Sequence, residues 1–541
     1  MNQKFSQNIS PILSILFVAL IFLFLIVFSP SKGIQYGDFG LMNIQVQDII
    51  ESGYSTFSLN YKGESVDPEH KFYPYTKPFI GKVNGKYYID FPPYFPLVNA
   101  PFVQLLGVNG LYLLNFISLL LTLFLLYKLG KLYELDNSLI HLSIILYSFG
   151  MTSTMYNLVF HEYPLGIFWI TLSFYFISHY YKKQNLSSLV LFGFFGALSL
   201  FFRLEMIFVI IASGLSLVFI QKKDFFKILI YSLSGFIFPF LLLLYLNYYI
   251  HGHPLGLRYL LTLTDNSTPS LLGRIAIIQD MLFSNTRGLF HQSPYIMILA
   301  GAILFGKKFL IKERFLFILI FIGFILILLT SPNHGDHRAP RYLFGIYPIL
   351  SLFSVICYRF LTTQINSNEE ILQAKVNISP KTKNILLTSL FAILILLSFH
   401  STFQNYRWMK RASLGVAEFN QRLSKIAENN PIIFRDYAQP LNSQNLYLNQ
   451  MMFVVENMDD LKNLLQKLKS TNVPKVIVSQ AFPSGLETGS RDNIVQNYSK
   501  SLTLTQQGDK FYFPNEEMYA IFEWIDLGKN QSLLVLNIFL N

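Results

Sequence analysis

Long apolar segments alternate with short polar segments from the start of the chain to about residue 402. A bilayer core of about 30 Å needs roughly 20 apolar residues per helix, and this criterion predicts about eleven membrane-spanning helices. The pattern therefore predicts an α-helical polytopic membrane protein. The predicted spans are residues 11–29, 110–130, 138–157, 163–181, 186–202, 204–221, 226–249, 293–306, 315–331, 341–361 and 384–402.

The apolar run 186–221 is divided into two spans because Arg203 and Glu205 stand in its middle. Lipid penalises charged side chains at that depth, so a turn is expected there. The segment 30–109 between the first two spans is far longer than an ordinary connection, and such loops are usually functional. Within it, the apolar positions of Leu41–Ile50 have helical spacing. They predict an amphipathic helix lying along the membrane interface.

The tail from residue 412 to 541 has a different pattern, in which helix-like and strand-like segments alternate. This order predicts a small α/β domain. The helix-like segments are Val416–Glu428 and Met458–Ser470, and the strand-like segments are Pro431–Phe434, Met451–Val455, Lys475–Ser479, Lys510–Phe513 and Met518–Ile525. We therefore expect a transmembrane domain over residues 1–402, with a large outer loop at 30–109, and a soluble domain over 412–541.

Composition agrees with a membrane protein and excludes several other classes. Of the 541 residues, 52% are hydrophobic and only 13% are charged, whereas soluble proteins carry about 25% charged residues. An ordinary soluble enzyme and a disordered chain are excluded. The single cysteine, Cys357, lies in an apolar run and is expected to be a buried, inert thiol.

The formal net charge of +11 comes from 42 Lys and Arg against 31 Asp and Glu, but no basic face of the nucleic-acid-binding type is present. The lysines instead form small clusters between apolar segments, for example Lys182/Lys183 and Lys222/Lys223/Lys227. This is the distribution that the positive-inside rule predicts for cytoplasmic loops. We expect a multi-pass protein of the cell (plasma or inner) membrane, with a cytoplasmic N-terminus and an extracytoplasmic C-terminal domain.

On this topology, unusual polar residues collect on the outer side of the membrane. Ionisable residues at such positions are costly and are candidates for function. The candidates are Asp38, His161, Glu162, Arg203, Arg258, Arg338 and Arg341, together with the histidines 251, 253, 291, 334 and 337. Each also has a plain structural explanation: Asp38 as a turn residue, Arg203 as the partner of Glu205 in a salt bridge, and the histidines as interfacial packing.

These residue types suit transfer of a group from a lipid phosphate to a hydroxyl at the membrane surface. An acceptor hydroxyl needs a carboxylate base within hydrogen-bond reach, which Asp38 or Glu162 could supply. A departing phosphate needs cationic donors, and the forked guanidinium of arginine suits a phosphate better than lysine does.

The order of these motifs over residues 1–402 resembles that of the membrane glycosyltransferases of the GT-C type, which include protein O-mannosyltransferases and aminoarabinose transferases. The motifs that carry the resemblance are Gly37-Asp38 after the first span, Phe91–Pro96 before the second, Glu162 with Pro164 at the fourth, Arg203-Leu204-Glu205, Asn285–Phe290 with Ser293-Pro294, and Arg338-Ala339-Pro340-Arg341-Tyr342.

The resemblance implies a hexosyl- or pentosyltransferase that uses a polyprenyl-phosphate sugar and inverts the sugar linkage on the non-cytoplasmic face. Asp38 would be the base or would position the acceptor, with Glu162 and His161 assisting. Arg203, Arg258, Arg338 and Arg341 would hold the donor phosphate. Many relatives have a second acidic residue directly after the first, where this chain has Phe39, so the choice of base between Asp38 and Glu162 stays open.

Several alternatives remain open at this stage. A transporter or flippase would carry polar breaks near the bilayer midplane in two matching halves, which the sequence lacks. An O-antigen ligase or polymerase would also take a polyprenyl-linked glycan, but its large loop is expected late in the chain. No cofactor is required, although Asp38, His161 and Glu162 could hold a divalent metal ion. The expected partners are a polyprenyl-phosphate sugar, a lipid, glycan or protein acceptor, and membrane lipids, but no nucleic acid.

Overall fold

The computed structural model describes residues 10–28, 37–264, 269–305, 312–333, 335, 338–366, 379–479, 491–514, 518–528 and 531–540. The chain forms two compact units. The helical unit comprises residues 1–29 and 105–409, and the mixed unit comprises residues 30–104 and 410–541.

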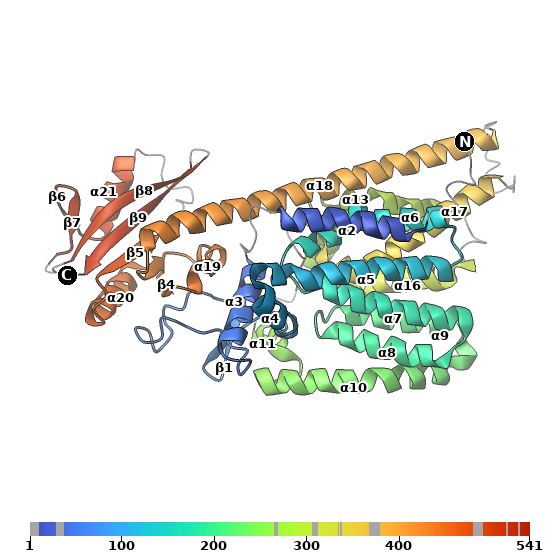
Figure 1. The fold of residues 1–541 in the computed structure, drawn as a ribbon, viewed down its shortest axis with the longest axis horizontal. Helices are drawn as coiled ribbons and strands as arrows, with labels where there is room; N and C mark the ends of the chain where they lie inside the picture. Colours follow the sequence, from blue (N-terminus) through green and yellow to red (C-terminus); the bar gives the residue numbers. More distant parts are fainter. Residues whose placement is uncertain are drawn as a thin grey trace. The chain divides into compact units, whose positions relative to one another are not determined.

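The helical unit consists of helices at each of the positions where the sequence predicts a span (Figure 1). They are α2 (Ile12–Val27), α5 (Gly110–Leu132), α6 (Asn137–Gly150), α7 (Tyr163–Lys183), α8 (Leu186–Leu200), α9 (Met206–Ile220), α10 (Phe225–His251), α11 (Gly256–Thr264), α12 (Leu271–Phe283), α13 (Leu289–Gln292), α14 (Ile298–Phe305), α16 (Arg314–Thr330), α17 (Tyr347–Asn366) and α18 (Pro380–Ala427), the last of which continues beyond this unit. Short 3-10 helices join them: Gly107–Asn109, Thr152–Leu158, Lys222–Asp224, Pro294–Met297 and Arg341–Ile346.

Among the described residues, four helical stretches are long and apolar enough to cross a membrane, or five if a pair bent by 68° is one span. The four are Tyr94–Leu132, Lys222–His251, Arg341–Ile365 and Pro380–Ala427, and the bent pair is Asn137–Gly150 with Thr152–Leu158. Five further helices are apolar but shorter, at 10–17 residues. The fold is thus that of a multi-pass membrane protein, and the number of about eleven spans remains a prediction.

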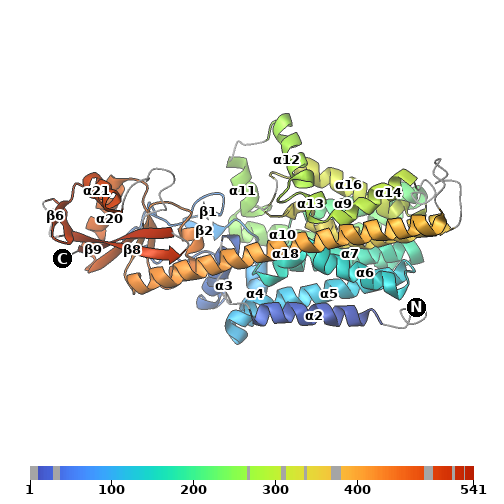
Figure 2. The same cartoon turned by 90° about the horizontal axis from the view of Figure 1, so that it is seen from above.

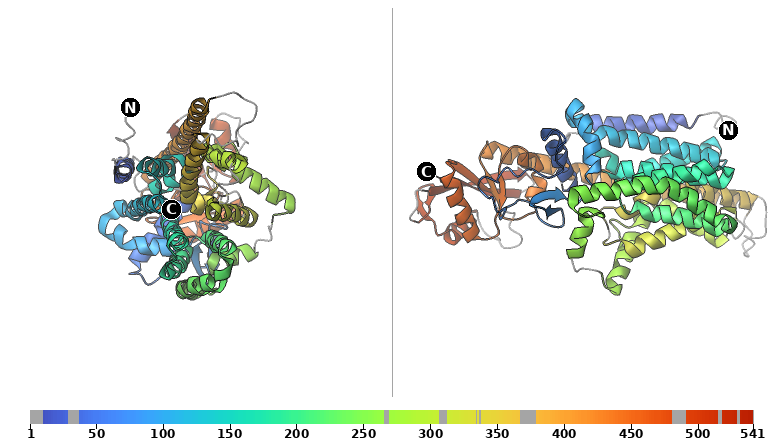
Figure 3. Two further views of the ribbon diagram at one scale, coloured as in Figure 1. Left: turned by 90° about the vertical axis from the view of Figure 1, so that its right-hand side faces the viewer. Right: turned by 90° about the horizontal axis from the view of Figure 1, so that it is seen from below.

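The long helices of this unit run side by side, with α7 between α5 and α8, and α8 against α10 (Figure 1). Seen end-on, their axes are roughly parallel (Figure 3). At the contact between α8 and α10, a Cβ on Gly193 would collide with the carbonyl oxygen of Ser232, and one on Gly235 with that of Val190. Glycine at both positions lets the two backbones touch, which is how helices pack closely in lipid.

Short connections place particular residues at the helix ends. Gln184 ends α7 in the left-handed region at φ +55°, and the side chain of Asn185 then accepts a hydrogen bond of 3.1 Å from Ser187 N at the start of α8. The expected break at Arg203 and Glu205 is present, because residues 201–205 form the turn between α8 and α9. At one edge of the unit, α11 and α12 lie at an angle to the long helices (Figure 2).

The mixed unit contains a seven-stranded sheet in the order β4-β3-β5-β9-β8-β7-β6. β3 pairs in parallel with β4 and β5, and the other pairs are antiparallel. The strands are β3 (Ile432–Phe434), β4 (Met452–Val454), β5 (Lys475–Ser479), β6 (Thr505–Gln507), β7 (Lys510–Tyr512), β8 (Met518–Gly528) and β9 (Gln531–Leu540), and the helices among them are α19 (Gln444–Tyr447), α20 (Met458–Ser470) and α21 (Arg491–Ser501).

Helix α20 shows how the sequence pattern builds this sheet region. Asn457 accepts a hydrogen bond of 2.8 Å from the backbone N–H of Asp460 and so caps the helix start. The leucines at 461, 464, 465 and 468 are all buried, so they form one apolar stripe of the helix. An amphipathic helix in an α/β domain buries its apolar stripe against a face of the sheet, which agrees with the α/β domain predicted for the tail.

The first loop belongs to the same unit as the tail. It contains α3 (Asp38–Glu51), the hairpin β1 (Ile80–Val83) and β2 (Lys86–Ile89), and most of α4 (Tyr94–Leu106). Val454 N donates to Phe72 O at 2.9 Å, and the Tyr447 hydroxyl donates to Asn60 O at 2.6 Å. The sequence pattern predicts that this loop belongs to the transmembrane domain, whereas in the structure its hydrogen bonds join it to residues of the tail.

A helix is present where the amphipathic stretch Leu41–Ile50 predicts one. In α3, however, polar as well as apolar positions are buried, including Asn43, Gln45 and Asp48. Gln45 Nε2 donates to Phe57 O at 2.8 Å, which satisfies one of these polar groups inside the unit. The helix is therefore embedded in its own unit on most sides, and its expected position along the membrane remains a prediction.

Candidate active site

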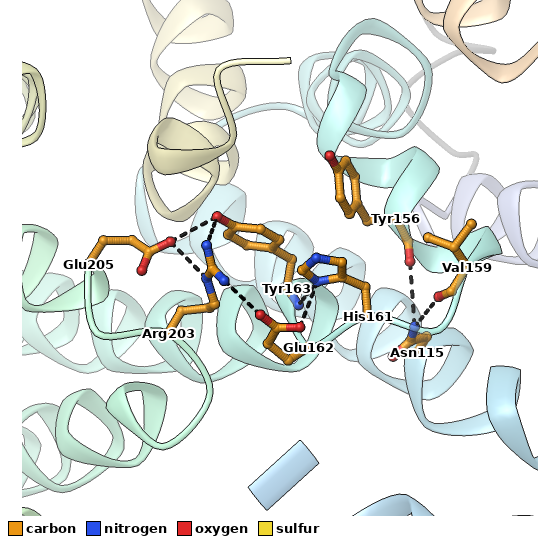
Figure 4. Close-up of polar contacts among 8 residues, drawn as sticks. All are labelled: Asn115, Tyr156, Val159, His161, Glu162, Tyr163, Arg203 and Glu205. Atoms are coloured by element: carbon orange, nitrogen blue, oxygen red, sulfur yellow. Dashed lines mark hydrogen bonds and ion pairs between the residues drawn. The ribbon is translucent and has the colours of Figure 1, made fainter. Parts of the chain in front are cut away.

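A cluster of buried charged residues lies at the helix ends of the helical unit (Figure 4). His161 and Glu162 immediately precede α7, whose first residue is Tyr163, and Arg203 and Glu205 occupy the turn between α8 and α9. The side chains of His161, Glu162 and Arg203 are at most 1% exposed. Because α7 packs against both α8 and α9, two turns far apart in sequence meet here.

Arg203 is the centre of this cluster. Its NH1 donates to Glu162 Oε1 at 2.7 Å and its Nε donates to Glu205 Oε1 at 2.8 Å. Its NH2 donates to the Tyr163 hydroxyl, and the guanidinium carbon lies 4.0 Å from the centre of the Tyr163 ring. Each nitrogen of the guanidinium thus has a partner within the cluster, which holds the two carboxylates in fixed positions (Figure 4).

Two residues that the sequence analysis did not assign complete the arrangement. The Tyr163 hydroxyl donates to Glu205 Oε1 at 2.8 Å. Asn115 of α5 donates from Nδ2 to Val159 O at 2.7 Å and so anchors the segment that carries His161. Both have a signal in the sequence: Tyr163 directly follows Glu162, and Asn115 is an isolated polar residue in an apolar run.

His161 extends the cluster from Glu162. Its Nδ1 lies 2.8 Å from Glu162 Oε2, on the side of the carboxylate away from Arg203. Its ring stacks on the Tyr163 ring at 4.9 Å and meets Tyr156 edge-on at 5.1 Å. The carboxylate of Glu162 is therefore held between an imidazole and a guanidinium.

These contacts determine the protonation of the carboxylates, which lie in turns outside the spanning helices. Burial by itself would raise the pKa of Glu162, but the charges of His161 and Arg203 outweigh it and lower the pKa to about 2. Burial likewise opposes the charge of Glu205, and Arg203 and Arg258 lower its pKa below the usual value. Both glutamates are therefore ionised at neutral pH and poorly suited to accept a proton.

Two further predicted site residues lie close to the cluster. The charge of Arg341 acts on Arg203, and that of Arg258 acts on Glu205. Arg258 of α11 also donates from NH2 to the Tyr342 hydroxyl at 3.5 Å. Arg341 begins the 3-10 helix Arg341–Ile346, which packs against α7, α9 and α16. Three arginines thus accompany two glutamates, so the cluster carries an excess of positive charge.

The other predicted residues lie elsewhere. Arg338 stacks its guanidinium 5.0 Å from the Trp408 ring, and its carbonyl oxygen accepts a 3.4 Å hydrogen bond from Asn405. Asp38 belongs to the mixed unit, where it is the first residue of α3 and follows Gly37, whose φ is +53°. A carboxylate in the first turn of a helix lies at the positive end of the helix dipole.

The sequence requires no metal ion but leaves open a divalent ion at Asp38, His161 and Glu162. Across the described ranges, no group of three His, Cys, Asp or Glu side chains is arranged to hold a metal ion. His334 and His337, which the sequence analysis also singled out, lie outside the described residues. His251, at the end of α10, is buried, and His253 stacks on Tyr259 at 4.9 Å.

No family model matches this chain, and no curated protein matches it. Among solved structures, it is similar to ArnT from Cupriavidus metallidurans bound to undecaprenyl phosphate, with 12% identity, a TM-score of 0.49, and 97% of each chain covered. The apo state of the same protein gives 11% identity and a TM-score of 0.49, covering 96% of this chain and 97% of that one.

The archaeal oligosaccharyltransferase AglB from Archaeoglobus fulgidus, in complex with an inhibitory peptide and a dolichol-phosphate, is also similar. It gives 10% identity and a TM-score of 0.47, covering 87% of this chain and 69% of that one. Both neighbours are glycosyltransferases of the GT-C type, which is the family that the sequence resembles.

Proposed function

We propose that this protein is an integral-membrane glycosyltransferase that moves a sugar from a polyprenyl-phosphate donor to an acceptor on the non-cytoplasmic face, with inversion. The observation that carries the proposal is the buried, arginine-rich cluster around Arg203 at the helix ends of the helical unit. Buried charges in a membrane protein are costly, so an excess of arginine at this depth favours an anionic lipid headgroup as its ligand.

In this mechanism, Arg258 and Arg341 meet the donor phosphate. As the bond between the anomeric carbon and the phosphate oxygen breaks, negative charge grows on that oxygen, and fixed guanidinium groups stabilise it. Arg203 has a different part, because its nitrogens are engaged by Glu162, Glu205 and Tyr163. It is a positioning residue that keeps these side chains in place.

The acceptor hydroxyl forms the new bond to the anomeric carbon and passes its proton to a carboxylate. Glu162 is a weak candidate for this base, because its lowered pKa of about 2 disfavours proton uptake. The resemblance assigns the role to Asp38, and we adopt that assignment. Glu162 and His161 then support the site through Arg203 and Tyr163.

The donor class can be tested with membranes that contain the protein. They are incubated with a panel of radiolabelled polyprenyl-phosphate sugars and, separately, with sugar nucleotides. We expect transfer from at least one lipid-linked sugar and none from the nucleotides. Transfer from a nucleotide together with none from any lipid-linked sugar would overturn the proposal.

A variant pair tests the role of the arginines. Arg341→Ala should lower kcat/KM for the lipid donor by about 100-fold, as expected when one charge-stabilising donor is removed. Arg359→Ala is the matched control, since Arg359 of α17 donates to the backbone oxygen of Glu134 and lies outside the cluster. Equal activity in both variants would remove Arg341 from the site.

A further inference from the structure

The mixed unit contains a cavity of about 440 Å³, formed by the end of α3, the chain that follows it, and the β1–β2 hairpin. Its volume falls within the range of about 300–1,000 Å³ that is typical of small-molecule sites. All of its lining residues belong to the first loop, and none is among the residues of the cluster around Arg203. The proposed mechanism does not use it.

One side of the cavity is acidic. The carboxylates of Asp48, Glu51 and Glu64 line it, and Lys86 is also part of the cavity lining. Asp48 is 6% exposed, and its Oδ2 accepts a hydrogen bond of 3.0 Å from Asn60 N. In the part of the chain that the structure describes, no basic side chain forms an ion pair with Asp48. This wall therefore has spare hydrogen-bonding capacity, since an ionised carboxylate has about four acceptor sites and a protonated one adds a donor.

Aromatic rings also line the cavity. His70 and Tyr87 both line the cavity and stack at 5.3 Å with an interplanar angle of 22°, and Tyr61 lies 5.2 Å from His70. Within the described residues, the Nδ1 atom of His70 is buried without a hydrogen-bond partner. Its Nε2 is 3.8 Å from Glu64 Oε1. A buried ring nitrogen that lacks a partner next to a cavity indicates a polar ligand there.

We propose that this cavity binds a sugar residue, which would make the acceptor a glycan; this inference rests on the proposed function. A sugar offers many hydroxyl donors for the carboxylates and for His70, and its apolar C–H groups can contact the aromatic rings that line the cavity. Because a neutral sugar carries no net charge, it needs no counter-ion in the cavity. Acceptor-rich walls beside aromatic rings are complementary to this combination of groups.

The proposal is tested by saturation-transfer difference NMR on the full-length protein in detergent, with methyl glycosides of glucose, galactose and N-acetylglucosamine as probes. Wild type should give a signal with at least one of them. Glu64→Gln and Tyr87→Ala should each weaken that binding about tenfold, the effect of losing one hydrogen bond to a charged group or one packing surface. Glu418→Gln, an exposed carboxylate that pairs with Arg422 on α18, should leave it unchanged.

Two outcomes overturn the proposal: no signal with any probe, or the same signal in Glu64→Gln, Tyr87→Ala and the Glu418→Gln control. The assay with radiolabelled lipid-linked sugars distinguishes these two outcomes from a failure of the proposed function. If lipid-linked sugars are used but the cavity variants bind probes normally, the cavity proposal alone fails. If the variants lose probe binding but no lipid-linked sugar is ever transferred, the donor chemistry fails, and the cavity loses its assignment as an acceptor site.

Discussion

Glu162 in the helical unit and Asp48 in the mixed unit are both almost completely buried, but they have different neighbours. Glu162 lies between His161 and Arg203, at 2.8 and 2.7 Å. Asp48 accepts a backbone hydrogen bond from Asn60, and the charges of Glu51 and Lys62 act on it in opposite directions. Burial opposes the charge at both sites. At Glu162 the interactions with His161 and Arg203 outweigh burial and lower the pKa to about 2, whereas at Asp48 burial prevails and raises the pKa to about 7.

The difference shows that burial alone does not decide what a carboxylate can do. Glu162 is a fixed anion that holds a cationic network in place, and its proton affinity is too low for acid–base chemistry at neutral pH. Asp48 changes protonation near neutrality and faces a cavity, which is typical of a carboxylate that meets a ligand. The helical unit therefore uses Glu162 to position other groups, whereas Asp48 of the mixed unit is a buried carboxylate that a ligand can contact.

The largest effect is expected from Arg203→Leu. Removing this side chain leaves Glu162 and Glu205 buried without their shared cation, and breaking such a buried pair costs about 3–5 kcal/mol. The free energy of unfolding, followed by thermal melting in detergent, should fall by that amount. Arg422→Leu, at an exposed pair with Glu418, should cost about 0.5 kcal/mol or less. Similar melting points for the two variants would show that the network does not stabilise the helical unit.

The second effect concerns pH. In the folded protein Asp48 keeps its proton up to about pH 7, whereas the usual pKa of 3.8 applies in the unfolded chain. Unfolding therefore releases a proton between these values, and this residue makes the wild type less stable as the pH rises through that window. Above about pH 8 its contribution stops changing.

Asp48→Asn removes this titration and keeps an oxygen that can accept from Asn60 N. Its melting temperature relative to wild type should therefore rise between pH 5 and pH 7, by an amount equivalent to a few kcal/mol, and then level off. Glu418→Gln serves as the control and should show no such trend. A difference between Asp48→Asn and wild type that is flat from pH 5 to pH 8 would contradict the account of Asp48.

A smaller effect is expected from Tyr163→Phe. This change removes the hydroxyl that donates to Glu205 and accepts from Arg203, but it keeps the ring under the guanidinium. Because Arg203 still holds both carboxylates, the loss of stability should be about 1–3 kcal/mol, the cost of leaving buried polar groups without one partner. Thermal melting measures it, and a loss as large as that of Arg203→Leu would place the tyrosine, rather than the arginine, at the centre of the network.

Much of the helical unit could be predicted because its signals are local. An apolar run of span length predicts a helix wherever it occurs, and the charges of Arg203 and Glu205 predicted the turn between α8 and α9. The grouping of His161, Glu162 and Arg203 followed from placing their turns on one side of the membrane. The contacts of Tyr163 and Asn115 could not be predicted in this way, because a tyrosine or asparagine in an apolar context does not indicate which residue it contacts.

The mixed unit was harder to predict because its decisive contacts are distant in sequence. The strands β3, β4, β5, β7 and β8 match predicted segments, but β6, β9 and the helix α21 were missed. β9 lies between β5 and β8 and pairs along the length of both, and its near-continuous apolar run has no alternation to mark it as a strand. The hydrogen bond between Val454 and Phe72 joins the tail to the first loop. The hydrophobic periodicity of neither segment predicts this contact.

The measurement that tests the central claim most directly is the turnover of purified Asp38→Asn and Glu162→Gln with a lipid-linked donor at pH 7, per folded molecule. If Asp38 is the base and Glu162 a fixed anion, Asp38→Asn should lose about 10²–10⁴ in kcat, the usual contribution of a general base. Glu162→Gln should keep kcat within about tenfold, because it loses positioning but no proton acceptor. Full loss in Glu162→Gln with near-normal turnover in Asp38→Asn would contradict the account and make Glu162 the base.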